Sequence, residues 1–100
     1  MHKIKLTITS IALVFTSLAA HAYTGSELEK GAKISMVEAR AIALKAHPGK
    51  ITDEELEKED GGSGLRYSFD IRHGRITQEV GVDASNGKVL ENKAEGKNPD

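Results

Sequence analysis

The segment from residue 65 to residue 72 restricts the fold more than any other part of the chain. Apolar and polar side chains alternate along it in the order Leu65, Arg66, Tyr67, Ser68, Phe69, Asp70, Ile71 and Arg72. A period of two places one set on each face of a β-strand. The pattern predicts a strand with one buried and one solvated face, and the apolar face needs a second layer to cover it.

A weaker strand is predicted before it, at residues 50–58. Ile51 and Leu56 are its only apolar residues, and their odd spacing predicts a β-bulge. The other side chains are mostly charged, which is typical of a strand at the edge of a sheet.

Two more strands are predicted after it, at residues 76–82 and 88–91. His73-Gly74 is expected as a two-residue hairpin turn, and residues 83–87 as the next turn. The expected apolar face of the sheet consists of Leu65, Tyr67, Phe69, Ile71, Ile76, Val80 and Val82.

A helix is predicted at residues 36–46, because Ser35 and Glu38 have the spacing of a capping box and strong helix formers follow. Pro48 and Gly49 end it. The expected buried stripe consists of Val37, Ala41 and Leu44, widened by Ile42 and Ala43. Helix and sheet each have one apolar face, so the predicted fold class is α+β, with one N-terminal helix packed on a three- to four-stranded antiparallel β-meander.

The first 22 residues have the organisation of a secretory signal peptide. Lys3 and Lys5 precede an uncharged stretch at residues 6–18, and Ala20-His21-Ala22 offers a cleavage site between small residues. The alternative, a transmembrane anchor, is disfavoured because the apolar stretch is shorter than the roughly 20 residues that span a bilayer. We expect cleavage after Ala22 and a periplasmic or secreted protein without a membrane span.

The mature chain then has 78 residues, with 12 basic and 15 acidic side chains and a net charge of −3. Within it we expect a flexible leader at residues 23–33, a folded domain at residues 34–91 and a disordered tail at residues 92–100. This charge gives no basic surplus for binding nucleic acid.

The residue types also argue against catalysis and metal binding. The chain contains no Cys, which excludes disulfides, thiolate ligands and a cysteine nucleophile. His47 and His73 lack zinc-site spacing and fit structural roles, and residues 83–87 lack the positions of a calcium loop. No nucleophile or phosphate-loop motif occurs. We therefore expect a non-catalytic protein without a cofactor or a resident metal.

Acidic side chains gather at residues 53–60, and this run is the candidate partner-binding site. The residues of this run that we assign to the site are Asp53, Glu54, Glu55, Glu57 and Glu59. Most such runs are solvated faces. The functional interpretations are recruitment of a basic partner, or pairing of the open strand edge with an extended segment. The alternative is a small-ligand or cation site formed by this strand and the loop that follows.

Taken in order, these motifs resemble the PepSY domain family. The matching segments are Ile34-Ser35-Met36-Val37-Glu38-Ala39, the helix exit at residues 43–49, the acidic residues 56–60, the strand 65–71 and Val82-Asp83-Ala84-Ser85-Asn86-Gly87-Lys88-Val89. The resemblance implies a helix packed on an antiparallel sheet in a secreted or envelope protein, and it brings no catalytic residues.

PepSY domains occur in propeptides of secreted metallopeptidases, to which inhibitory or chaperone roles are assigned, and as stand-alone envelope proteins. No peptidase domain follows Asp100 in this sequence. The resemblance therefore implies that inhibition or regulation of an envelope peptidase, or of another envelope protein, would act in trans.

Overall fold

The computed structural model describes residues 22–95. The predicted signal peptide, apart from Ala22, and the end of the predicted tail lie outside this range. The elements in chain order are the 3-10 helix η2 (Ser26–Gly31), the helix α2 (Met36–Ala46), and the strands β1 (Lys50–Lys58), β2 (Leu65–His73), β3 (Ile76–Asp83) and β4 (Val89–Ala94). Within the described range, every helix is too short or too polar to cross a membrane.

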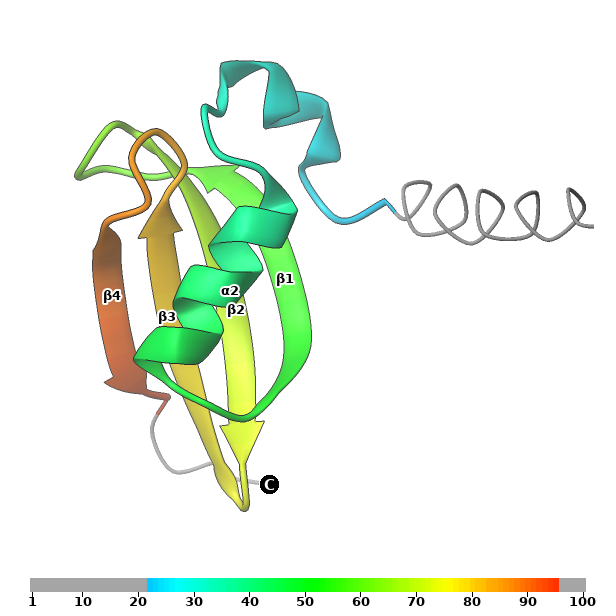
Figure 1. The fold of residues 1–100 in the computed structure, drawn as a ribbon, viewed down its shortest axis with the longest axis vertical. Helices are drawn as coiled ribbons and strands as arrows, with labels where there is room; N and C mark the ends of the chain where they lie inside the picture. Colours follow the sequence, from blue (N-terminus) through cyan, green and yellow to red (C-terminus); the bar gives the residue numbers. More distant parts are fainter. Residues whose placement is uncertain (1–21, 96–100) are drawn as a thin grey trace, which may run out of the picture.

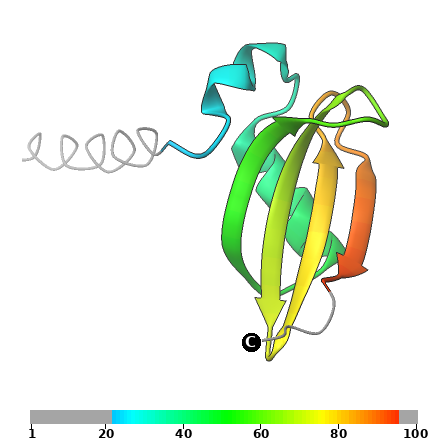
Figure 2. The same ribbon diagram turned by 180° about the vertical axis from the view of Figure 1, so that it is seen from behind.

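The four strands form one antiparallel sheet in the order β1-β2-β3-β4, so each strand pairs with its neighbour in sequence. The helix α2 lies across one face of this sheet (Figure 1). We call this the inner face, and the opposite face, seen from the front in Figure 2, the outer face. The predicted α+β meander is confirmed, with four strands and with β1 at an edge. The predicted bulge is confirmed too, as a register shift between Ile51 and Asp53.

The helix α2 begins and ends where the sequence predicts. The Ser35 hydroxyl accepts a hydrogen bond from the Glu38 amide at 3.1 Å, and the Ser35 amide donates to the Glu38 carboxylate at 2.9 Å. This reciprocal pair is the capping box. At the other end His47 is already extended, and its amide donates to the Ala43 carbonyl.

The prediction of the buried stripe of α2 was wrong for two of its three central residues. Val37 is 68 % exposed and Ala41 is exposed, whereas Met36, Ala39 and Ala43 face the sheet. The two buried alanines let the helix axis approach the large side chains of the sheet closely. The sequence left this rotation open, because its Ala and Leu residues are distributed over several sides of the helix and do not form one narrow stripe.

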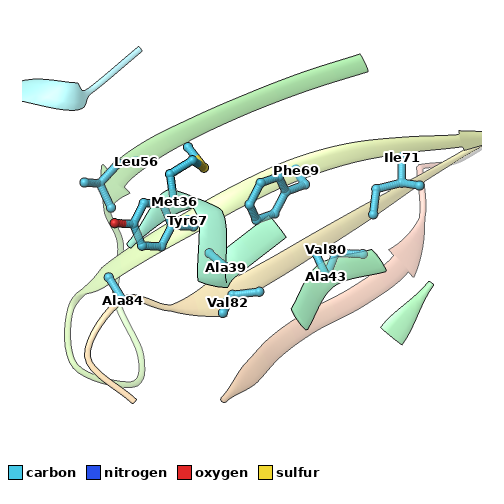
Figure 3. Packing of buried hydrophobic residues seen from close by; sticks show 10 residues of the cluster. All are labelled: Met36, Ala39, Ala43, Leu56, Tyr67, Phe69, Ile71, Val80, Val82 and Ala84. Carbon is cyan, nitrogen blue, oxygen red and sulfur yellow. The ribbon is translucent and has the colours of Figure 1, made fainter. Parts of the chain in front are cut away.

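The core lies between α2 and the inner face (Figure 3). The sheet contributes Leu56, Tyr67, Phe69, Ile71, Val80 and Val82, all at most 2 % exposed. The hydroxyl of Tyr67 donates to the Ile34 carbonyl at 2.8 Å, so the buried phenol keeps a partner.

Two details of the β2–β3 hairpin differ from the prediction. The turn residues are Gly74 and Arg75, while His73 pairs with Ile76 as the last pair of the ladder. Gly74 has φ 66° and no residue other than glycine has positive φ in the described chain, which suits a turn that needs glycine at its first central position. Ile76, expected in the core, is 53 % exposed because the hairpin extends past the end of α2.

The last strand is longer than predicted. It continues to Ala94 instead of ending at residue 91, because residues 92–94 pair with residues 78–80 of β3. These three residues therefore belong to the sheet and not to a disordered tail.

Residues 23–33, expected to be a flexible leader, pack against the domain. Thr24 forms a parallel bridge with Glu55, and its carbonyl accepts the Leu56 amide at 2.9 Å. Gly25 has φ 86°, and a Cβ there would lie 1.8 Å from the Leu56 carbonyl oxygen. Residues 26–31 of this segment form the 3-10 helix η2, and Leu28 packs against the core.

Candidate functional site: the acidic outer face of the sheet

The strand register assembles the outer face from residues that are far apart in sequence. Asp70 of β2 lies directly opposite Asp53 of β1 and Glu79 of β3. Two residues before Asp70 on β2, Ser68 lies opposite Glu55 of β1 and Gly81 of β3. Gly81 in turn lies opposite Glu91 of β4. Cross-strand partners point to the same side of a sheet. The outer face therefore carries the carboxylates of Asp53, Glu55, Glu57, Asp70, Glu79 and Glu91.

This face is hollowed along its middle. A depression of about 330 Å³ is lined by seven charged side chains and by Ser68, Phe69 and Val80, the charged ones being Glu55, Glu57, Glu59, Arg66, Asp70, Glu79 and Glu91. Gly81 lies under the Arg66 side chain, and a Cβ there would lie 2.8 Å from its Cδ. The missing side chain at Gly81 therefore leaves room for the arginine to lie flat on the sheet.

Arg66 is the main cation within the depression. Its guanidinium contacts Glu91 at 3.4 Å and donates to the Asp60 carbonyl at 3.5 Å, and its Nε is buried with no hydrogen-bond partner in the described chain. Lys93 lies 3.7 Å from the other Glu91 oxygen, and the Ser68 hydroxyl donates to Glu57 at 2.7 Å. Arg66 and Lys93 thus bring positive charge to Glu91, whereas Glu57 gains a hydrogen bond but no opposite charge.

The remaining carboxylates repel one another. Partial burial, followed by the charges of Glu57, Asp53 and Asp70, raises the pKa of Glu55. Partial burial, followed by Asp53 and Glu79, likewise raises the pKa of Asp70.

Glu79 lies at the acidic centre of the same group. Burial raises its pKa, as do Glu91 and Glu95, while Lys93 acts in the opposite direction. Single carboxylate oxygens of Asp70, Glu79 and Glu95 all lie within 4.8 Å of one another. The face therefore holds ionised groups that a positive charge would stabilise.

One residue of the predicted site lies elsewhere. Glu54 points to the inner side, where the guanidinium of Arg40 donates to both of its oxygens at 2.9 Å. Asp53, Glu55 and Glu57 lie on the outer face, and Glu59 lines the same depression just after β1. The structure therefore brings four of the five predicted residues together and separates Glu54 from them.

Sequence reasoning missed the acidic residues that β2, β3, β4 and the residue after β4 contribute, namely Asp70, Glu79, Glu91 and Glu95. The alternation at residues 65–72 already placed Asp70 on the solvated side. The missing information was the register, which sets Asp70 beside Asp53 and Glu79.

The sequence also suggested that the edge of β1 is open to pair with an extended segment of a partner. In the structure only part of this edge is open. Thr24 covers the edge at Glu55 and Leu56. Beyond it a groove of about 490 Å³ follows residues 51–54 and is also lined by Tyr23 and Arg40. The edge is thus shortened by the chain's own N-terminal segment.

Buried Asp83 fixes the loops at one end of this face. Its carboxylate accepts the Ser63 hydroxyl at 2.6 Å, the Ser63 amide at 2.9 Å and the Ser85 amide at 2.9 Å. These hydrogen bonds, with that of the Ser63 hydroxyl first, lower the pKa of Asp83 against the effect of burial. Because its oxygens are engaged by the protein, the role of Asp83 is structural.

A small α+β domain with one covered and one open, charged sheet face is a form suited to binding other molecules. The chain belongs to the PepSY family: residues 33–93 match the family described as peptidase propeptide and YPEB domain. Such domains are propeptide or regulatory domains, generally non-catalytic and typically extracellular or periplasmic. The comparisons found no matching curated protein and no matching solved structure.

Proposed function

We propose that this chain is a non-catalytic binding module of the cell envelope that regulates a peptidase, or another envelope protein, in trans. The outer face of the sheet receives a basic surface of that partner. The observation that carries this proposal is the row of facing carboxylates Asp53, Asp70 and Glu79, which the domain itself leaves largely unneutralised.

A basic partner gains from this face in two ways. A Lys or Arg side chain placed between these carboxylates removes their mutual repulsion, and it favours their ionised forms. Binding should therefore release protons when the pH is near the raised pKa values of Glu55, Asp70 and Glu79. Arg66 already occupies part of the depression and limits where a cation of the partner fits. It therefore helps to set the orientation in which the partner binds.

The location in the envelope is part of the same proposal. It is supported by the signal-peptide pattern at residues 1–22 and by the compartment typical of the family. N-terminal sequencing of protein isolated from the periplasm tests it, with Tyr23 as the expected first residue.

The binding experiment compares two double variants with the same change in net charge. Glu55→Gln with Glu79→Gln alters the outer face, whereas Glu27→Gln with Glu29→Gln removes two exposed carboxylates of η2, outside the acidic run. Partners are captured from periplasmic extract, identified by mass spectrometry and titrated as purified proteins by calorimetry at pH near 5 in two buffers of different ionisation enthalpy.

We expect the outer-face variant to weaken binding about tenfold and to reduce proton release, with the control close to the original protein. If the partner binds the original protein and the outer-face variant with equal affinity, the proposal is wrong. A peptidase among the identified partners is then assayed for inhibition, and unchanged peptidase activity at saturation removes the regulatory part.

The alternative function is cation binding, and one observation favours it. Asp70, Glu79 and Glu95 bring carboxylate oxygens within 4.8 Å of one another, and the first two are half-buried. Calcium, zinc and copper are each added in a thermal melt. A melting temperature that rises with ion concentration supports this function, whereas no shift at millimolar ion eliminates it.

A further inference from the structure

The end of the molecule where α2 meets β1 carries charge opposite to that of the outer face. No acidic residue occurs in residues 39–52 or in residues 71–78, although both segments contain cations. The fold brings the two segments together: Lys50 pairs with Arg72, and a Cβ on Gly49 would lie 2.6 Å from the Arg72 carbonyl oxygen. The basic end, as we call it, consists of the exposed side chains of Lys45, Lys50, Arg72 and Arg75.

An exposed apolar side chain lies at the same end of the sheet. Ile76 is 53 % exposed at the tip of the β2–β3 hairpin, next to Arg75 in sequence and opposite His73 in the ladder. The hairpin is the most protruding part of this end of the sheet (Figures 1 and 2).

The acidic residue that follows β4 lies close to this end of the sheet. The Glu95 amide donates to the Thr77 carbonyl at 2.8 Å, which places Glu95 beside the base of the hairpin. Its side chain, however, joins those of Asp70 and Glu79 on the outer face. Its carboxylate therefore belongs to the acidic cluster of the outer face, whereas the charged side chains of residues 39–52 and 71–78 are all basic.

We infer that the basic end docks on an anionic phospholipid surface, with Ile76 among the headgroups and with Lys45, Lys50, Arg72 and Arg75 against the lipid phosphates. An exposed apolar side chain at an end that also carries several exposed cations is a combination suited to interfacial binding. The cations come from a helix end, a strand and a protruding hairpin, a spread that fits an extended surface better than one small anion. The inference does not rest on the proposed function, because it uses the cations and Ile76 at the end of the sheet and not the carboxylates of the outer face.

Fluorescence gives a direct test, because the chain contains no Trp. Ile76→Trp places a single reporter at the hairpin tip, and Val37→Trp places one on the exposed side of α2 as the matched control. Vesicles contain either phosphatidylcholine alone or phosphatidylcholine with about a third phosphatidylglycerol, at about 0.05 M and about 0.5 M salt.

We expect a blue shift for Ile76→Trp with the anionic vesicles at low salt, and none with neutral vesicles or for Val37→Trp. No blue shift with anionic vesicles, or equal shifts for both reporters, would overturn the inference.

Cosedimentation with the vesicles, using chains without a Trp reporter, measures the role of the cations. Each cation near an anionic surface contributes about fivefold to the partition coefficient, so Arg72→Gln with Arg75→Gln should lower it about 25-fold. The control, Lys30→Gln with Lys58→Gln, removes two exposed cations elsewhere and should change it less than about threefold. Equal losses for the two double variants would contradict a specific basic end.

Two further measurements complete the test. Thermal melts show whether the arginine variant stays folded, and Lys45→Gln with Lys50→Gln repeats the experiment without altering the hairpin, with the same loss expected. Inorganic phosphate at the concentration of the vesicle phosphate should leave binding unchanged. Release by this phosphate would identify a free-anion site and refute the membrane inference.

Discussion

The inner and outer faces of the sheet come from the same four strands but differ in how their side chains are satisfied. On the inner face Tyr67, Phe69 and Val80 are covered by α2, and even the Tyr67 hydroxyl has a partner. On the outer face, Asp70 lies between two other carboxylates that face it across the ladder. The inner face thus provides stability, whereas the outer face retains repulsion that costs stability and that a ligand of opposite charge would relieve.

The largest effect is expected on the inner face. Phe69→Ala should lower the free energy of unfolding by about 3–5 kcal/mol, because it leaves a cavity beneath α2. This is comparable to the whole stability of a domain of this size. Urea unfolding followed by circular dichroism measures it, and a cooperative transition within about 1 kcal/mol of the original would contradict the assignment of the core.

The next effect concerns the buried carboxylate of Asp83. Asp83→Ala leaves the Ser63 and Ser85 amides without their acceptor and should cost about 3 kcal/mol. Asp83→Asn keeps the shape and one acceptor oxygen, and should cost less. If both variants unfold at the original urea concentration, these loops do not depend on Asp83.

The pH dependence of stability separates the two kinds of carboxylate. The raised pKa values of Glu55, Asp70 and Glu79 mean that the folded state binds protons more tightly than the unfolded chain, so stability rises as the pH falls from 7 through these pKa values. The lowered pKa of Asp83 acts in the opposite direction, and its contribution is lost below its ordinary range.

We therefore expect the highest melting temperature near pH 4–5, at about the ordinary pKa values of carboxylic acids. Asp70→Asn should raise stability at pH 7 by about 0.5–1 kcal/mol and flatten this profile. A melting temperature that falls steadily between pH 7 and pH 5 would show that the outer face is not under repulsion.

The smallest effect compares neighbours on opposite faces of β1. Glu54→Gln removes the charge that Arg40 binds at 2.9 Å and should destabilise the fold by about 0.5–1 kcal/mol. Glu55→Gln removes repulsion and should stabilise it by a similar or smaller amount. Thermal melts at pH 7 measure both, and changes of the same sign would remove the distinction between the faces along this strand.

Much of the fold was predictable because its signals are local. The alternation of β2, the capping box at Ser35 and the helix exit at Pro48 each depend on a few adjacent residues. The rotation of α2 about its own axis was not predictable. Ala39 and Ala41 are chemically identical, and only the packing of the helix on the sheet decides that Ala39 is buried and Ala41 exposed.

The candidate site was predictable only strand by strand. The acidic run identified Asp53, Glu55 and Glu57, but a run of consecutive acids also contains members of the opposite face, and Glu54 is one of them. Asp70 and Glu79 join the site through the register, which depends on the turn at Gly74 and on the bulge after Ile51.

The consecutive order of the strands has a consequence for how the chain reaches its fold. Every strand pairs with a strand that is adjacent in sequence. The sheet can therefore form by successive closures of short loops. The two-residue turn at Gly74 makes the β2–β3 hairpin the shortest of these closures. We expect this hairpin to form in the transition state, with α2 docking later, so that substitutions at Gly74 slow folding while those at Ala39 mainly speed unfolding.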